Sequence, residues 1–423
     1  MSIYWKMKQS LLLFFSTALF LFPNTTFGSK LPSLINTTNS VYVNSTIVNI
    51  IYKNGVFSIK GLTGTGHVKI YSIIGNEVAS FNQVDLFDSN KALSQTSSSS
   101  SKLLHGGIRY LEFGHLPLVR ESLLDRHWWL INAPEYCTPF EMHIPIYKNT
   151  SRSMLKLFMG AFLYKILAGK YSLGPSKWNS SKNSQKLLNE IKNTNFKGSV
   201  SFYDLQMDEA GLGLWVKKNA IKSGVKIFEN MPIRKFDTNG NLQLPNGDSK
   251  SYDFILNIAG PWSAELNKLN MIKTDFDLEL IRGSHLFIER PINNFYLLQE
   301  SAGKRIIFVM PYNGQTLVGT TEVTQDLHDP ISCSSEESEY LISIYNNFFE
   351  KELTVNDIKT TFSGLRPIIN NIKKRKQIFV PSMASREMKI FDENRLVSLY
   401  GGKWTSAPST AKKILKKIQS IKI

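Results

Sequence analysis

One short stretch of the chain concentrates the residue types that bind anions and flat rings. Five serines, Ser97 to Ser101, are followed directly by Lys102, by His105-Gly106-Gly107 and by Arg109-Tyr110. Serine hydroxyls and the backbone N–H groups of a tight turn suit phosphate oxygens, and paired glycines let a ring approach the main chain. Arginine adds a planar fork of donors for an anion. A serine run alone is typical of a solvated linker, but the pattern that follows favours a binding loop.

More cations and glycines recur toward the C-terminus. Arg366 lies in a strand-like stretch, Arg386 precedes another, and Lys403 follows the pair Gly401-Gly402. Cations that arrive from separate strands, together with Arg109, predict a cage for a dianionic phosphate. Each of them alone is equally consistent with an ordinary surface charge.

Periodicity predicts the elements that must position these residues. Residues 84–88 form a short apolar strand that ends in Asp88. A dinucleotide-binding fold places there the carboxylate that bonds the adenosine ribose, so Asp88 is a candidate. An aspartate that starts a turn explains the position equally well. A helix is expected over about 117–131, packed behind the serine-rich loop.

The middle of the chain alternates between helix and strand patterns. Residues 201–204, a helix opened by Asp208-Glu209, and residues 225–228 predict a β-α-β unit. A later apolar strand ends at Gly260, where backbone can meet a cofactor without an intervening side chain. Residues 270–360 alternate as in an antiparallel sheet, with His285 at a strand start. A lone histidine is usually a structural residue whose hydrogen bonds are satisfied. Residues 336–349 predict a helix, and its acidic residues are expected on a solvated face.

Two stretches lie outside this scheme. Residues 155–173 are apolar, aromatic and basic. They fit either a helix in a membrane interface or a buried helix of a substrate-binding domain. Residues 177–197 are polar and are expected to form a surface excursion.

The serine-rich loop also carries a family resemblance. Residues 100–112, Ser-Ser-Lys-Leu-Leu-His-Gly-Gly-Ile-Arg-Tyr-Leu-Glu, resemble the signature of the FAD-dependent glycerol-3-phosphate dehydrogenases, members of the D-amino-acid-oxidase-like flavoprotein superfamily. Further matches recur in order at residues 257–262, 282–285, 318–322, 363–367 and 400–405. Together they extend over residues 84–415, about three quarters of the chain.

This resemblance implies a mixed α/β fold, in which an FAD-binding Rossmann-like domain is interleaved with an antiparallel-sheet substrate domain. It implies oxidation of sn-glycerol 3-phosphate to dihydroxyacetone phosphate, with hydride passing to FAD and electrons to quinone or another acceptor. It further implies peripheral membrane contact at the cytoplasmic face of the inner membrane. The implied catalytic residues are Arg109, Arg366, Arg386 and Lys403 as substrate ligands, His285 as proton acceptor and Tyr110 as its helper. The implied cofactor-binding residues are Asp88, Ser98, Ser100, Ser101, Lys102, His105, Gly106, Gly107, Gly260, Gly401 and Gly402.

The first eighty residues depart from that family pattern. A basic start and an apolar run make residues 1–28 similar to a secretory signal, which leaves export open. A membrane-surface anchor or a wrongly assigned gene start explains the segment equally well. A dinucleotide fold needs a Gly-x-Gly-x-x-Gly turn before a helix, whereas residues 61–66 have the spacing reversed and precede strand-like residues. The expected domains are therefore a β-rich block over 29–83, the FAD domain over 84–126, 198–265 and 362–423, and the substrate domain over 127–197 and 266–361. The alternatives are a related amine or amino-acid oxidase, and an inactive secreted or fused remnant that binds no FAD.

Composition is compatible with this interpretation. The 423 residues are 42% hydrophobic, enough for a large core, and carry a net charge of +16. Such a charge suits phosphorylated metabolites or an acidic membrane surface, and a Lys- and Asn-biased source organism explains it equally well. No basic stripe with interleaved aromatics marks a nucleic-acid groove. The two cysteines, Cys137 and Cys333, form no recognisable metal or disulfide framework.

Overall fold

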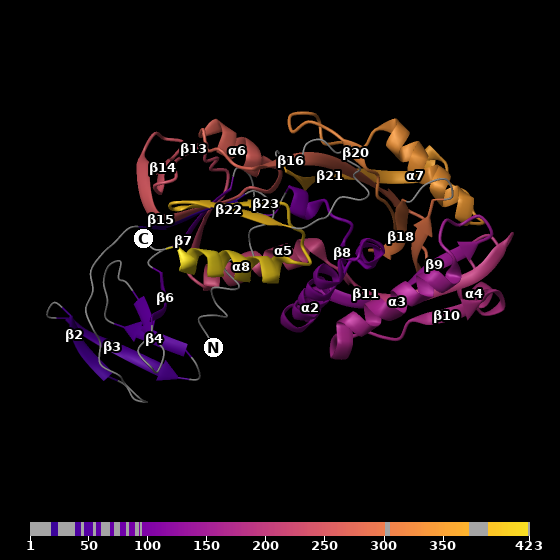
Figure 1. Cartoon of the computed structure of the whole chain (residues 1–423), viewed down its shortest axis with the longest axis horizontal. Coiled ribbons are helices and arrows are strands. Elements are labelled where there is room, and N and C mark those ends of the chain that lie inside the picture. Colours follow the sequence, from indigo (N-terminus) through magenta and orange to yellow (C-terminus); the bar gives the residue numbers. More distant parts are fainter. Residues whose placement is uncertain are drawn as a thin grey trace.

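The structure is a computed structural model. Between residues 18 and 88 it describes the backbone of separate strands, and beyond them it describes backbone and side chains of residues 93, 95–300, 305–370 and 388–421. Arg386 and the glycine-rich residues 61–66 lie outside the described residues, as do the side chain of Asp88 and those of the other strands before residue 93. Two large sheets dominate the fold (Figure 1).

The first sheet is the α/β part of the fold. Its central strands are β12 (Val225–Phe228), β7 (Val84–Asp88), β1 (Ala18–Pro23) and β15 (Ser249–Ile258), extended by β14 (Asn241–Gln243) and β13 (Lys235–Phe236). On the other side, β23 (Leu396–Tyr400) runs parallel to β15 and pairs with β22 (Lys389–Glu393). β12 and β7 are parallel, as expected for a doubly wound sheet.

Strand β1 is the unexpected part of this sheet. It lies between β7 and β15 and runs antiparallel to both. Its residues, Ala18–Pro23, belong to the segment that resembles a secretory signal. The remaining early strands form two small sheets, one of β2 (Asn39–Val43), β3 (Thr46–Lys53) and β4 (Val56–Lys60), the other of β5 (Val68–Tyr71) and β6 (Glu77–Phe81). Strands are therefore present within residues 29–83, which the sequence predicted to be rich in β structure.

The second sheet is mostly antiparallel and has ten strands. Its order is β10 (Lys177–Ser180), β11 (Phe196–Met207), β9 (Cys137–Tyr147), β17 (Phe295–Gln299), β18 (Ile306–Tyr312), β19 (Gln315–Gly319), β16 (Phe276–Ile288) and β20 (Val323–Thr324). β21 (Ile358–Asn371) pairs with β16 and β8 (Leu103–Leu104) with β11. Strands β11 and β21, which the sequence-based boundaries assign largely to the FAD domain, thus belong to this second sheet. Residues 177–197, expected to form a surface excursion, contain β10 and helix α4 (Ser181–Leu187).

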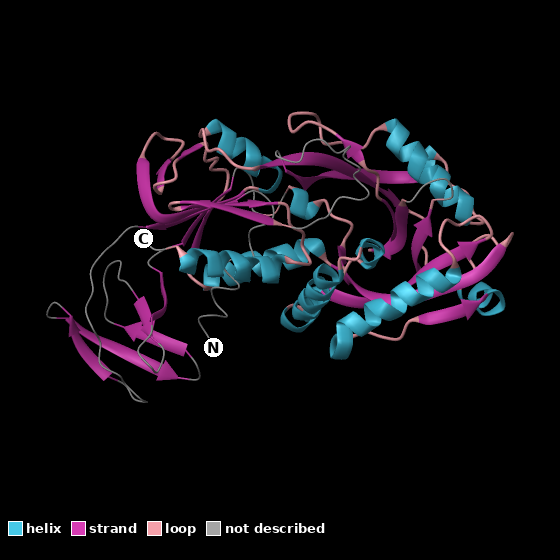
Figure 2. Cartoon of the chain, in the orientation of Figure 1, coloured by secondary structure: helices cyan, strands magenta, loops and turns pink. Residues whose placement is uncertain are grey.

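Helices cover both sheets (Figure 2). On the first sheet these are α5 (Glu209–Lys222), α6 (Ser263–Leu269) and α8 (Ala407–Ser420), and on the second α2 (Leu116–Asn132), α3 (Met154–Ala168) and α7 (Ser335–Phe348). Asp208 caps α5, because its carboxylate accepts from the Gly211 N–H at 3.0 Å. Among the described residues, no helix is both long and apolar enough to cross a bilayer.

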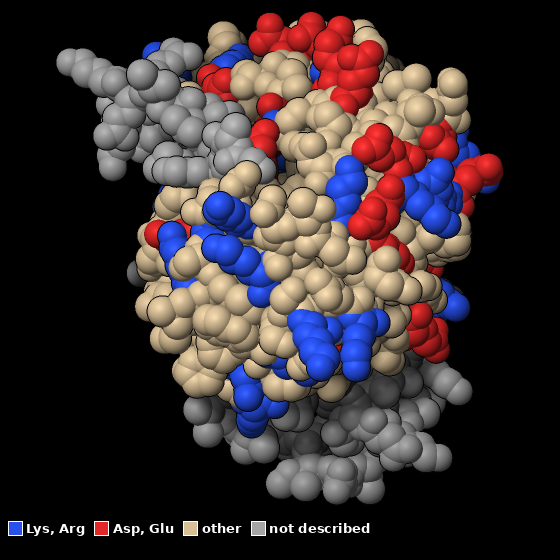
Figure 3. Space-filling view, turned by 90° about the vertical axis from the view of Figure 1, so that its right-hand side faces the viewer, with Lys and Arg blue, Asp and Glu red and all other residues tan. Residues whose placement is uncertain are grey.

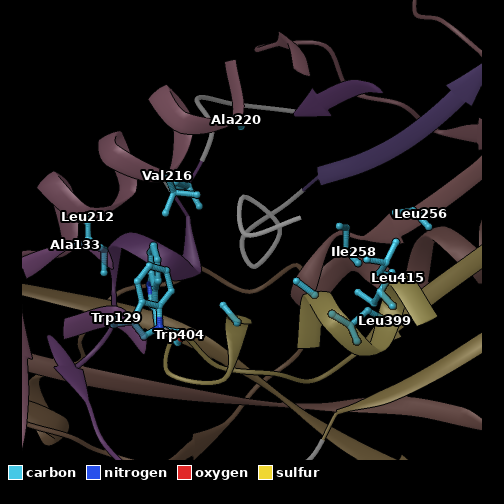
Figure 4. Close-up of a cluster of buried hydrophobic side chains, with 14 of the residues drawn as sticks. Trp129, Ala133, Leu212, Val216, Ala220, Leu256, Ile258, Leu399, Trp404 and Leu415 are labelled. Atoms are coloured by element: carbon cyan, nitrogen blue, oxygen red, sulfur yellow. Dashed lines mark hydrogen bonds between the residues drawn. The ribbon is translucent and has the colours of Figure 1, made fainter. Parts of the chain in front are cut away.

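The main core joins the first sheet to its helices and to α2. The cluster includes Leu212, Val216 and Ala220 of α5, Leu415 of α8, and Leu256, Ile258 and Leu399 of the strands (Figure 4). At the edge of this core, the Trp129 and Trp404 rings meet at 64° with centroids 5.9 Å apart. The predicted helix behind the serine-rich loop is thereby held against the segment that carries Lys403.

Candidate functional site

A cavity opens where the serine-rich loop passes between the two sheets. Its walls come from that loop, from the ends of β15 and β23, and from β16 and β21. The described residues that line it are Thr96, Ser97, Ser99, Ser100, Ser101, Leu103, His105, Ile258, Gly260, His285, Gly364, Leu365, Arg366, Pro367, Ile368, Leu399, Gly401, Gly402, Lys403, Trp404 and Thr405. The cavity therefore contains most of the residues that the sequence singles out, although they come from distant parts of the chain.

Hydrogen bonds anchor the loop to the segment after β23. The Trp404 indole N–H donates to the Ser97 carbonyl at 2.8 Å, and the His105 N–H donates to the Thr405 hydroxyl at 3.1 Å. The indole N–H of Trp129 donates in turn to the carbonyls of Trp404 and Thr405, both at 3.2 Å. The glycine pair Gly401-Gly402 and the serine loop are thus fixed as one wall.

A buried ion pair lies beneath the loop, and sequence reasoning missed half of it. The Lys102 ammonium contacts the Glu209 carboxylate, with both side chains buried. Glu209 also accepts from the Ser100 N–H at 3.1 Å and from its hydroxyl. Burial raises the pKa of Glu209, although the neighbouring Lys102 charge and the Ser100 hydrogen bonds oppose that shift. The sequence predicted only that Glu209 opens a helix, and no local pattern indicates its partner.

Gly106 has a steric reason to be glycine. A Cβ on Gly106 would lie 2.6 Å from Leu123 and from the Tyr164 hydroxyl. The Gly106 N–H donates to that hydroxyl at 2.6 Å, and Tyr164 donates to Asp204 at 2.9 Å. Asp204 is paired with Arg126 at 2.8 Å. This chain of contacts holds the loop close to α2 and β11.

His285 lines the cavity, although almost all of its surface is buried. Its Nε2 lies 2.9 Å from the Ser101 hydroxyl, and its ring stacks on Phe362 with centroids 4.7 Å apart. Burial and the nearby charges of Arg366 and Lys102 hold the pKa of His285 well below its usual range. The imidazole is therefore neutral near pH 7, the form that can accept a proton.

Glu337 fixes the strand segment that carries His285. Its carboxylate accepts from the Ser284 hydroxyl and from Arg282, both at 2.8 Å, and from the Thr321 hydroxyl at 2.5 Å. Burial opposes the charged form, but these hydrogen bonds prevail and lower the pKa of Glu337. The expectation that the acids of this helix form a solvated face is therefore wrong for Glu337, because topology brings α7 against β16.

The predicted cations divide into three groups. Arg366 and Lys403 line the cavity. The guanidinium of Arg366 donates to the Thr320 hydroxyl at 2.5 Å and fits beside Gly283, where a Cβ would clash with it. Arg109 lies instead 3.9 Å from Glu322, at the edge of a second cavity. Arg386 lies outside the described residues, so its place in the cage stays a prediction.

The remaining predicted residues surround the cavity. The Tyr110 ring lies under the Lys403 ammonium, 5.4 Å from it, and packs close to Gly107. Ser98 is exposed, and its carbonyl accepts from Lys102 at 3.0 Å. Asp88 is the last residue of β7. Its role at a ribose stays a prediction.

The cavity wall suits a flat ring that approaches backbone. Gly260, Gly401 and Gly402 have φ values of 57°, 75° and 102°, a conformation that favours glycine and leaves the main chain bare. Ile258 and Leu399 supply apolar wall, and Ser100, Ser101 and Thr405 supply hydroxyls. These residues fit the redox ring of a flavin.

Comparison with known proteins agrees with this assignment. Residues 78–416 match the family described as FAD dependent oxidoreductase. An aerobic glycerol-3-phosphate dehydrogenase of Escherichia coli (strain K12) is 30% identical over 76% of this chain and 66% of its own length. A D-erythritol 1-phosphate dehydrogenase of Brucella abortus (strain 2308) is 29% identical over 77% of this chain and 66% of its own. The chain thus spans just under two thirds of the length of these relatives.

A solved structure agrees in fold. The glycerol-3-phosphate dehydrogenase from Bacillus halodurans complexed with FAD superposes with a TM-score of 0.59 at 22% identity, over 80% of this chain and 59% of that one. The expected mixed α/β fold, which combines a Rossmann-like sheet with a largely antiparallel sheet, is confirmed. The chain belongs to the family of FAD dependent oxidoreductases, and its cofactor is FAD.

Proposed function

We propose that the protein oxidises sn-glycerol 3-phosphate at C2 to dihydroxyacetone phosphate. The observation that carries the proposal is the convergence of Arg366 and Lys403 in the cavity that fits the flavin ring. A dianionic phosphate is the ligand that such cations bind best, and neutral or carboxylate substrates need fewer of them. The named activities of the two relatives, on phosphorylated polyols, support the same substrate class.

The residues of the site have separate roles in the proposed reaction. Arg366 and Lys403 hold the phosphate, and Arg386 completes the cage, whereas Arg109 lines the second cavity and takes no part in it. Neutral His285 accepts the proton of the C2 hydroxyl, and Ser101, 2.9 Å from its Nε2, keeps the ring oriented. Tyr110 supports the Lys403 ammonium from below. Bound FAD supplies the hydride acceptor.

The proposal extends to the electron acceptor and the place of action. A quinone is proposed as the final acceptor, at the cytoplasmic face of the inner membrane. The net charge of +16 and the exposed apolar residues of α3 support contact with an anionic lipid surface. Co-sedimentation with lipid vesicles tests the proposed membrane contact. The protein should sediment with anionic vesicles and not with neutral ones, and a protein that sediments with neither would exclude the contact.

Arg366→Ala tests the role of the cage. Loss of charge-assisted hydrogen bonds, about 1.5–3 kcal/mol, predicts a KM for sn-glycerol 3-phosphate raised about 10- to 150-fold, with FAD retained. Arg290→Ala is the matched control, because Arg290 is a partly exposed arginine that follows β16 and pairs with Asp357. The assay follows reduction of a dye and identifies the product. An unchanged KM, or oxidation of glycine in place of the phosphate ester, would exclude the proposed substrate.

A further inference from the structure

Four tryptophans lie in a row of ring contacts that begins at the flavin cavity. They are Trp404, which follows β23, Trp129 and Trp128 of α2, and Trp215 of α5. The centroid of the Trp129 ring lies 5.9 Å from that of Trp404, 5.1 Å from Trp128 and 6.4 Å from Trp215, each pair edge to face. Figure 4 shows Trp404 beside Trp129. Trp129 is therefore the branch point of a continuous row of indoles.

The row leads from the interior to solvent. Trp404 lines the cavity and is 7% exposed, and Trp129 is completely buried. Trp128 and Trp215 are half-buried, so water reaches part of each of them. The cavity end of the row is thus joined to two surface ends through an indole that touches no solvent.

The two inner indoles are held so that they keep their N–H protons. The Trp404 N–H donates to the Ser97 carbonyl at 2.8 Å, and the Trp129 N–H donates to the carbonyls of Trp404 and Thr405 at 3.2 Å. A carbonyl oxygen accepts a hydrogen bond but is too weak a base to take the proton. An inner indole that lost one electron would therefore remain a cation, and an isolated cation in an apolar interior is costly.

The charges of the cavity favour movement of such a cation outward. Lys403 precedes Trp404 in the chain, and Arg366 lines the same cavity. Both repel a positive charge on Trp404, and this repulsion falls with distance. Water stabilises the same charge at Trp128 or Trp215. Electrostatic repulsion and solvation therefore both favour the transfer of an electron from the surface indoles, through Trp129, to Trp404.

We propose that the four tryptophans pass single electrons from a small thiol in solution to light-excited FAD. Trp404 gives one electron to the flavin, Trp129 restores Trp404, and Trp128 or Trp215 restores Trp129. The surface indole then loses its N–H proton to water, and an electron from the thiol and a proton from water restore it. After two such transfers two thiols have become one disulfide, and FAD holds two electrons and two protons.

Blue light on the FAD-loaded full chain, without oxygen or glycerol phosphate, tests this activity with dithiothreitol as the thiol. The visible absorbance of the flavin reports its reduction, and its fluorescence lifetime reports the transfer from Trp404. The unaltered chain should bleach in light and far more slowly in the dark, and its fluorescence should be strongly quenched. Because neither readout involves the proposed substrate, failure of the electron transfer and failure of the proposed oxidation are distinguishable.

Three variants separate the steps, each with FAD retained in its visible spectrum. Trp404→Phe removes the first donor, so it should lengthen the fluorescence lifetime and abolish bleaching. Trp129→Phe keeps that donor, so the lifetime should stay short while bleaching is lost, because the electron returns to Trp404. The double variant Trp128→Phe/Trp215→Phe should behave as Trp129→Phe does. It replaces only half-buried rings, so it tests the same step without altering the buried Trp129.

Trp178→Phe is the matched control for the loss of an indole. Trp178 is 48% exposed on β10 and contacts Phe158 of α3. β10 lies at the end of the molecule that faces the viewer in Figure 3, away from α5 and α8. Trp178→Phe should bleach and fluoresce as the unaltered chain does.

Three results would overturn the proposal. The first is an unaltered chain that bleaches no faster in light than in the dark. The second is bleaching of Trp129→Phe and of the double variant at the rate of the unaltered chain, which would mean that the thiol reaches the flavin directly. The third is a loss of bleaching in Trp178→Phe as large as that in the double variant.

Discussion

Asp125 on α2 gives a prediction whose size follows from the structure. Its side chain is buried between α2 and α8, 5% exposed, and its Oδ2 has no hydrogen-bond partner among the described residues. Burial, with a smaller repulsion from Glu121, raises the pKa of Asp125 from its ordinary 3.8 to about 7. The folded protein therefore binds this proton more tightly than the unfolded chain does.

The sign of the pH effect follows from this difference. Stability associated with the protonated carboxyl is complete below pH 3.8 and is lost as the pH rises, until the loss is complete above about pH 7. A shift of about three units corresponds to about 4 kcal/mol at pH 8 and to about 2 kcal/mol at pH 5.5. Asp125→Asn keeps the shape and removes the charge, so it should raise the free energy of unfolding by these amounts.

Urea denaturation with excess FAD at the two pH values measures the gain. The advantage of Asp125→Asn should grow by about 2 kcal/mol from pH 5.5 to pH 8. Glu393→Gln, which replaces an exposed carboxylate, should show no comparable growth. A gain that is equal at both pH values, or a loss at pH 8, would refute the inference that this carboxyl is held protonated.

Three further predictions concern the support of the site. Glu209→Gln leaves the buried Lys102 charge without its counterion and should destabilise the protein by about 3–5 kcal/mol. The double variant, in which Leu and Met replace both residues of the pair, should lose less stability. Equal losses in the two variants would contradict a coupled pair. Glu337→Gln should lower the free energy of unfolding by about 1.5–3 kcal/mol at pH 7, and by less as the pH falls below 4.5, because the pKa of Glu337 is lowered. Urea denaturation measures this loss, and a loss that does not vary with pH would contradict a stabilising Glu337 carboxylate. Because the pKa of His285 is lowered, the fall of kcat/KM in acid that is due to this residue should occur below pH 6.5. This fall should be absent in His285→Asn. A fall that begins above pH 6.5 would exclude His285 as the base.

Local patterns in the sequence predicted many of the elements. Apolar spacing places the helix behind the serine-rich loop at about 117–131, and the structure has it at Leu116–Asn132. The strand before Asp88, the helix after Asp208 and the antiparallel strands around His285 are present as well. In these segments the spacing of apolar residues and the caps decide the backbone, and both are visible in the sequence.

Long-range pairings were not predictable in the same way. Lys102 and Glu209 are 107 residues apart, and nothing near either residue identifies the other. In the sequence Gln299 is an ordinary residue at the end of a strand. Only the structure shows that its side chain is buried without a hydrogen-bond partner among the described residues. The sequence left α3 open between a buried and an interfacial helix, and the structure shows a half-buried helix with an exposed apolar face. Each of these features depends on which elements topology brings together.

In the proposed function, cations and a flavin ring meet in one cavity to oxidise a phosphorylated alcohol. Anaerobic titration of the FAD-loaded protein, followed by its visible absorbance, measures this reaction. We predict that sn-glycerol 3-phosphate bleaches the bound cofactor, that glycerol and glycine do not, and that Lys403→Met requires far more of the phosphate ester. Protein that stays coloured with the ester, or that glycerol bleaches equally well, would contradict it.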